Sequence, residues 1–155
     1  MNFKTHLTFG ILLGLVALPF VKGIHWIIFF PIVILGALLP DIDHPQSKFG
    51  KKLDIFSKLI NSLGGHRGIT HSLYPLIALP GLIWYLFGLP CGIALFIGYF
   101  SHLLIDSINP KGVNFLNPLA TWHMRGFIET GSIGEWIVFI ILVAGIGLTV
   151  FMTYF

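Results

Sequence analysis

The chain has 155 residues, of which 55% are hydrophobic and only 10% are charged, and its mean hydropathy is +0.90. A water-soluble domain of this size could not bury so large an apolar fraction, so the composition excludes a large soluble catalytic domain and predicts an integral membrane protein. The single cysteine excludes a disulfide-stapled secreted module, and a net charge of +3 spread over loops gives no basis for nucleic-acid binding. We expect one all-α, membrane-embedded domain over residues 1–155.

Uncharged stretches predict a helical bundle with about five transmembrane helices. The uncharged run 68–105 would reach about 57 Å as one helix, nearly twice a hydrocarbon core of about 30 Å, so it must fold back on itself. Two glycines and a proline within residues 88–92 mark that break. The first four spans are shorter than about twenty residues, so we expect their ends to lie inside the protein. The predicted spans are 6–21, 24–39, 72–87, 91–106 and 136–155.

Basic residues predict the orientation of these spans. All nine lysines and arginines except Lys22 fall on one side of the bundle, which the positive-inside rule assigns to the cytoplasm together with the N-terminus. Residues 19–22 offer no small-residue cleavage site, so we expect the first span to be retained and not removed as a signal peptide. The sequence therefore predicts a multi-pass protein of the cell (inner or plasma) membrane.

Two segments lie between the spans. Residues 49–63 repeat apolar side chains at helical spacing against lysines, as an amphipathic helix would on an anionic inner leaflet, although a helix packed on the bundle fits equally well. Residues 107–135 contain two Asn-Pro pairs and few periodic apolar residues, which predicts an irregular cap.

Most histidines and carboxylates fall at the predicted cytoplasmic ends of the spans. Elements far apart in the sequence would then bring imidazoles and carboxylates to one end of one bundle, as in known bundle metal sites. His25 alone among the histidines lies at the opposite side. The residues at the cytoplasmic ends are His6, Asp41, Asp43, His44, His66, His71, His102, Asp106 and Glu135.

Four local patterns carry this prediction. One is the pair of His6 at the start of the first span and Glu135 at the start of the fifth, although His6 alone also fits a polar residue of helix packing. Residues 39–45 end the second span at a proline and supply three potential ligands on a backbone that prolines restrict, although they also fit an acidic helix cap. Residues 66–72 place two histidines around Arg67, which could hold a phosphate, although they also fit a basic juxtamembrane turn. His102 and Asp106 share a helix face, because they are four residues apart, and the simpler alternative is a His–Asp hydrogen bond.

The mixed donor set favours zinc over calcium or magnesium, with manganese or iron as the other options. Nine candidates exceed the needs of one ion, so we expect two or three ions per chain that share a bridging carboxylate, activate a water and hold a phosphoryl oxygen. His66 or Glu135 would serve as a further ligand or proton-transfer group, and Arg67 would hold the phosphate. The expected metal ligands are His6, Asp41, Asp43, His44, His71, His102 and Asp106.

At residues 40–45, 66–72 and 102–106 the chain resembles the YdjM-like family, the LexA-regulated, predicted membrane-bound metal-dependent hydrolases. This resemblance implies a bacterial or archaeal inner-membrane protein with metal-dependent hydrolase activity. A more distant, phospholipase-like similarity rests on the spacing from His102 to Asp106. It links the chain to zinc-dependent phospholipases C and P1-type nucleases, which are soluble exported enzymes.

Together these features predict a membrane metallohydrolase that cleaves a phosphoester of a lipid or lipid-linked substrate at the cytoplasmic leaflet. The substrate follows from location, because a site at the membrane surface meets anionic headgroups first. One alternative is a metal-ion or proton transporter, or a metal sensor, that uses the same ligands without hydrolysis. Another is a structural membrane protein with polar helix caps and no bound metal. The sequence assigns no role to His123 and no oligomeric state.

Overall fold

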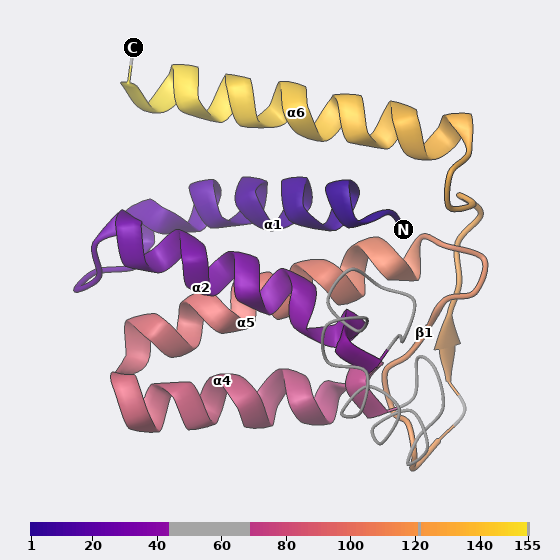
Figure 1. The fold of residues 1–155 in the computed structure, drawn as a ribbon, viewed down its shortest axis with the longest axis horizontal. Coiled ribbons are helices and arrows are strands. Elements are labelled where there is room, and N and C mark those ends of the chain that lie inside the picture. The colour runs from indigo at the N-terminus through magenta and orange to yellow at the C-terminus, as the bar shows by residue number, and fades with distance from the viewer. Residues whose placement is uncertain (44–68, 121, 155) are drawn as a thin grey trace.

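The computed structural model describes residues 1–43, 69–120 and 122–154 (Figure 1). Several predictions lie outside these described residues: the amphipathic helix over 49–63, His44, His66 and Arg67, together with the side chain of Asp43.

Five α-helices of the described chain coincide with the five predicted apolar spans, so these helices are confirmed, with ends shifted by a few residues. The prediction of an irregular cap over residues 107–135 is wrong in part. Two short strands pair there in antiparallel fashion, with Val113 opposite Met124, so the fold is mainly helical with a very small sheet. The elements are α1 (Phe3–Ala17), η1 (Leu18–Phe20), α2 (Trp26–Leu38), η2 (Leu39–Asp43), η3 (Ile69–His71), α4 (Leu73–Phe87), α5 (Leu89–Ser107), β1 (Val113–Asn114), β2 (His123–Met124) and α6 (Ile133–Tyr154).

Helix α5 lies at the centre of the bundle. It packs against α1, α2 and α4, whereas α6 packs on α1 at the edge (Figure 1). Between α4 and α5 the chain reverses at Gly88, whose φ of 92° is readily adopted only by glycine, which explains the predicted break in the long apolar run. About half of the α5 segment is buried against other helices, so any polar residue near its end is held inside the protein.

Two glycines let α2 and α5 approach almost backbone to backbone. A Cβ atom on Gly98 would lie 2.0 Å from the Val33 carbonyl oxygen, and one on Gly36 would lie 2.5 Å from the Leu95 carbonyl oxygen. Small residues allow such close approach between apolar helices, where dispersion contacts and hydrogen bonds, not a hydrophobic driving force, hold helices together in lipid. This contact brings the last turns of α2 and α5 within hydrogen-bonding distance of each other.

Three of the described helical segments are long and apolar enough to cross a membrane: Phe3–Phe20, Leu89–Ser107 and Ile133–Thr153. Trp26–Asp41 and Leu73–Phe87 are shorter apolar helices packed beside them. The described residues thus form a mainly helical bundle with membrane-length helices, and the number of crossings, five, stays a prediction.

Candidate metal centre

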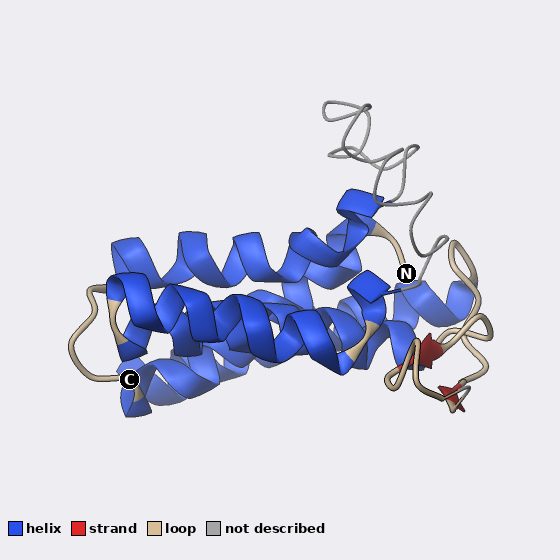
Figure 2. Ribbon diagram, turned by 90° about the horizontal axis from the view of Figure 1, so that it is seen from below, coloured by secondary structure: helices blue, strands red, loops and turns tan. Residues whose placement is uncertain are grey.

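Five of the predicted metal ligands meet at one end of the bundle. This end holds the start of α1, the end of α2, the start of α4, the end of α5 and the start of α6, with the two strands beside them (Figures 1 and 2). The five residues come from five separate elements or turns: His6 from α1, Asp41 from η2, His71 from η3, and His102 and Asp106 from successive turns of α5.

His102 is the central residue of this cluster, and it is completely buried. Its Nδ1 lies 2.7 Å from the carbonyl oxygen of Ala37, and because a carbonyl can only accept, Nδ1 is the donor. A neutral imidazole then carries its lone pair on Nε2, which makes no hydrogen bond among the described residues. That Nε2 faces two carboxylates, at 3.7 Å from Asp41 Oδ1 and 3.9 Å from Asp106 Oδ2.

Asp106 faces three imidazoles. Its Oδ1 lies 3.3 Å from His6 Nε2, and its Oδ2 lies 3.7 Å from His71 Nε2 and 3.9 Å from His102 Nε2. The amino group of Met1 donates to Oδ1 over 2.7 Å. The rings of His6 and His102 are stacked, with centroids 3.9 Å apart and an interplanar angle of 11°. The carboxylate, which is 1% exposed, is therefore enclosed by nitrogen groups.

Side-chain hydrogen bonds fix the short helix that carries His71. The hydroxyl of Tyr99, a buried residue of α5, donates to the carbonyl oxygen of Thr70. The hydroxyl of Thr70 lies 3.1 Å from His71 Nδ1, and the backbone N–H of Leu73 donates to the carbonyl oxygen of Phe115 in the cap. These contacts attach η3 to α5 and the adjoining start of α4 to the cap, which together position the His71 ring.

The donor atoms have the spacing that a divalent cation needs. Two groups, His6–Asp41–His102 and His71–His102–Asp106, each bring three donor atoms within 4.8 Å of one another. Four ligands about 2.1 Å from a tetrahedral zinc ion are about 3.4 Å apart. The nitrogen–oxygen distances of 3.7 to 3.9 Å within these two groups are slightly longer. Donor type, burial and spacing therefore all fit a metal ion.

Both groups use the same nitrogen of His102, because its Nδ1 is already bonded to Ala37. One nitrogen lone pair binds one ion, so the two groups cannot each hold an ion through His102 at the same time. The described residues offer ligands for at least one ion, and the expected two or three ions per chain stay a prediction.

Comparison with known proteins agrees with the resemblance seen in the motifs. The profile of the family described as YdjM inner membrane protein matches residues 1–154. The chain belongs to this family. It is 37% identical over 138 residues to the Escherichia coli protein "Inner membrane protein YdjM", which covers 81% of this chain and 69% of the relative.

Two further relatives are similar to this YdjM-family chain. The Bacillus subtilis protein "Uncharacterized protein YvsG" is 36% identical over 141 residues, covering 89% of this chain and 87% of the relative. The Escherichia coli protein "Inner membrane protein YbcI" is 36% identical over 94 residues, covering 55% of this chain and 50% of the relative. No solved structure matches the chain.

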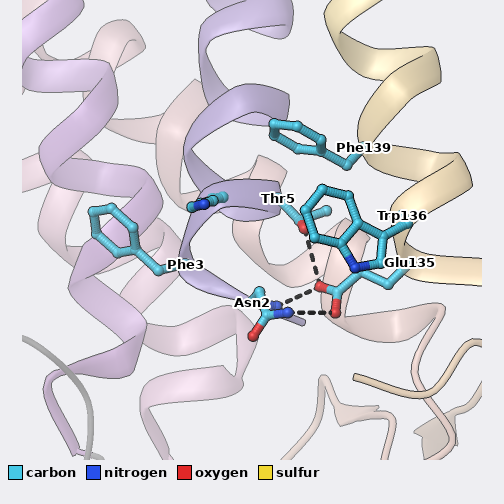
Figure 3. Close-up of a pocket in the computed structure, with 7 residues that line it drawn as sticks. Asn2, Phe3, Thr5, Glu135, Trp136 and Phe139 are labelled. Carbon is cyan, nitrogen blue, oxygen red and sulfur yellow. Dashed lines mark hydrogen bonds between the residues drawn. The ribbon is translucent and has the colours of Figure 1, made fainter. Parts of the chain in front are cut away.

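Glu135 belongs to a different set of contacts in this family member. Its Oε1 accepts from the backbone N–H of Asn2 and from the Thr5 hydroxyl at 3.0 Å, and its Oε2 accepts from Asn2 Nδ2 at 2.8 Å (Figure 3). Its Oε2 also accepts from the Gly131 N–H at 2.6 Å. It is in neither metal-binding group. Four donors to one carboxylate favour an anchoring role between α6 and α1, and its predicted role as ligand or proton-transfer group stays a prediction.

The remaining described histidines lie away from the cluster. His25 lies just before α2, at the end of the bundle opposite to the cluster, as the sequence predicts. Its side chain accepts a hydrogen bond from the N–H of Ile27. His123 is exposed in β2. Residues that the sequence analysis did not single out are Tyr99 and the acceptor Ala37. Glycines at 36 and 98 in otherwise apolar helices were the available signal for the close contact that positions Ala37.

Proposed function

We propose that this chain is a membrane-bound metal-dependent hydrolase that acts on a phosphoester of a lipid or lipid-linked substrate at the cytoplasmic leaflet. The observation that carries the proposal is the orientation of His102. Its Nδ1 is fixed by a backbone carbonyl, and its Nε2 points at two carboxylates from different elements. A hydrogen-bonded far nitrogen is the usual means of orienting a histidine ligand toward a metal.

Burial supports a resident cation. Three imidazoles and the Asp106 carboxylate are 0 to 1% exposed, and enclosing such groups in an apolar bundle is unfavourable unless partners compensate them. The Met1 ammonium, 2.7 Å from Asp106 Oδ1, is one such partner, and a metal ion bound between the carboxylate and the imidazoles would be another. Imidazole and carboxylate donors without thiolates suit zinc, with manganese or iron as alternatives. When bound, such an ion supplies a Lewis acid that polarises a phosphoryl oxygen and acidifies a water molecule.

The two carboxylates of the cluster differ in exposure. The Asp41 side chain is 28% exposed, whereas the Asp106 side chain is 2% exposed, so Asp41 is the more accessible of the two. In this proposal His6, His71, His102, Asp41 and Asp106 supply the ligands, with Asp41 on the more exposed side. Arg67 is proposed to hold the phosphate and His66 to transfer a proton, because both precede His71 by a few residues in the sequence.

The distribution of polar groups favours hydrolysis over transport. A conducting path needs polar side chains at many depths of the bilayer. Among the described residues, the buried charged and imidazole side chains are His6, His71, His102, Asp106 and Glu135, and all lie at the same end of the bundle. A site at one membrane surface near anionic headgroups suits a lipid phosphoester.

The test is hydrolysis of phosphatidate and phosphatidylglycerol by the purified full chain, with zinc or manganese added after treatment with a chelator. We expect metal-dependent product release that falls at least about 100-fold in His102→Ala and Asp41→Ala, with His123→Ala as the matched control. Full metal content and activity in both variants would refute the proposal. Metal uptake into proteoliposomes without hydrolysis would establish the transporter alternative instead.

A further inference from the structure

A cavity of about 300 Å³ lies between the first turns of α1 and α6 (Figure 3). Its lining has two chemical parts. Phe3, Trp136 and Phe139 supply aromatic surface, and Asn2 and Glu135 supply polar surface. The cavity adjoins the candidate metal centre but is separate from it, since none of these five residues belongs to either metal-binding group.

Among the described residues that line the cavity, Lys4 is the cation, and its side chain is exposed. Glu135 does not compete for it in the structure, because both oxygens of that carboxylate already accept two hydrogen bonds each. A ligand with an anionic group at Lys4 and an apolar part on Trp136 and Phe139 would match the lysine and the aromatic part of the lining.

The position of the cavity indicates where such a ligand comes from. It lies between Phe3–Phe20 and Ile133–Thr153, two segments of membrane-crossing length, near the end of both. Only 6% of the second segment is buried within the protein, so the described chain leaves most of this apolar helix uncovered, and such a surface suits contact with lipid. A ligand that enters the cavity from the bilayer is therefore an amphiphile, with its headgroup at the interface and its tail in the hydrocarbon region.

We propose that this cavity is a binding site for one anionic glycerophospholipid, with its phosphate at Lys4 and the start of one acyl chain along Trp136 and Phe139. At about 30 Å³ for each water-sized group, the cavity holds about ten such groups. That is enough for a phosphoglycerol headgroup or the first part of a chain, with the remainder in the bilayer. Lipid binding at this site requires no metal ion, so a failure of the hydrolase proposal would not refute it, and its own failure would not refute the hydrolase proposal.

Native mass spectrometry of the detergent-purified full chain tests this site, with phosphatidylglycerol and phosphatidylcholine of identical acyl chains as probes. We expect one retained phosphatidylglycerol per chain, bound more tightly than phosphatidylcholine. Lys4→Gln should weaken phosphatidylglycerol about fivefold, as expected for one lysine at an anionic headgroup, without changing phosphatidylcholine. Trp136→Ala should weaken both lipids. Lys22→Gln is the matched control, because Lys22 is exposed near the opposite end of α1.

Three results would overturn the proposal: no retained lipid in the wild type, equal binding of both lipids, or equal losses in Lys4→Gln and Lys22→Gln. The last would show a general effect of charge and no specific site. Because the Lys4 side chain is exposed, we expect Lys4→Gln to fold as the wild type does. Each lipid titration is repeated after chelator treatment, and binding that persists without metal separates this site from the metal centre.

Discussion

Replacing Gly98 by alanine tests whether the close contact of α2 and α5 positions the metal centre. The added Cβ would lie 2.0 Å from the Val33 carbonyl oxygen, whereas an ordinary contact is at least 3.4 Å. The two backbones must therefore separate by about 1.4 Å at this point, because neither contact atom is on a flexible side chain. His102 lies one turn further along α5.

The same separation would break the hydrogen bond that orients His102. A shift of this size lengthens the distance from Nδ1 to the Ala37 oxygen from 2.7 Å to roughly 4 Å, beyond hydrogen-bonding range. We expect a loss of about 1–3 kcal/mol of unfolding free energy from overpacking, and a further 1–3 kcal/mol from the buried N–H left unpaired. Zinc affinity should fall about 10- to 100-fold, as for other groups that orient a histidine ligand.

The assay combines thermal unfolding in detergent with zinc titration by calorimetry. Gly81→Ala is the matched control, because a Cβ on this α4 glycine meets nothing within 4 Å. Alanine there should keep wild-type zinc affinity and stabilise the helix by about 0.5–1 kcal/mol. If Gly98→Ala binds zinc as tightly as Gly81→Ala, the backbone contact does not position His102 and the reasoning is wrong.

Three further substitutions probe the surroundings of the centre. Tyr99→Phe should lower unfolding free energy by about 1 kcal/mol and weaken zinc binding, while Tyr74→Phe on the exposed face of α4 should do neither in the same titrations. Glu135→Gln turns an amide N–H₂ toward groups that are themselves donors, so it should destabilise the chain by about 1–3 kcal/mol in denaturant unfolding. Glu129→Gln, at an exposed residue, should not, and equal stability of the two variants would argue against Glu135 as an anchor between α6 and α1. Asp106→Asn should lower zinc affinity at least about 100-fold in competition with a chelator, and an unchanged affinity would remove this residue from the ligand set.

Hydropathy predicted the helices well because each one is a long apolar segment ended by charge, glycine or proline. The break at 88–92 was visible for a physical reason, since Gly88 adopts a backbone angle that other residues avoid. The pairing of β1 with β2 was not predicted. Two-residue strands are too short to show an alternating pattern, and their pairing depends on how the cap lies against α5.

For the candidate site, the spacing of His102 and Asp106 was informative because residues four apart share a helix face. The convergence of His6, Asp41 and His71 on that pair follows from the topology of the spans. The sequence could not predict that the Ala37 carbonyl orients His102, because every residue has a backbone carbonyl and the residue type does not show which one accepts a hydrogen bond. The number of ions was also beyond the sequence, since it depends on which nitrogen each histidine has free.

Metal X-ray absorption on the purified full chain tests whether the His and Asp cluster binds a divalent cation. We expect at least one retained zinc with only nitrogen and oxygen ligands, at about 2.0–2.1 Å, and with imidazole scattering that diminishes in His102→Ala. Absence of any retained zinc, manganese or iron would contradict this claim. So would a sulfur ligand at about 2.3 Å, because the one cysteine, Cys91, lies at the far end of α5 from the cluster.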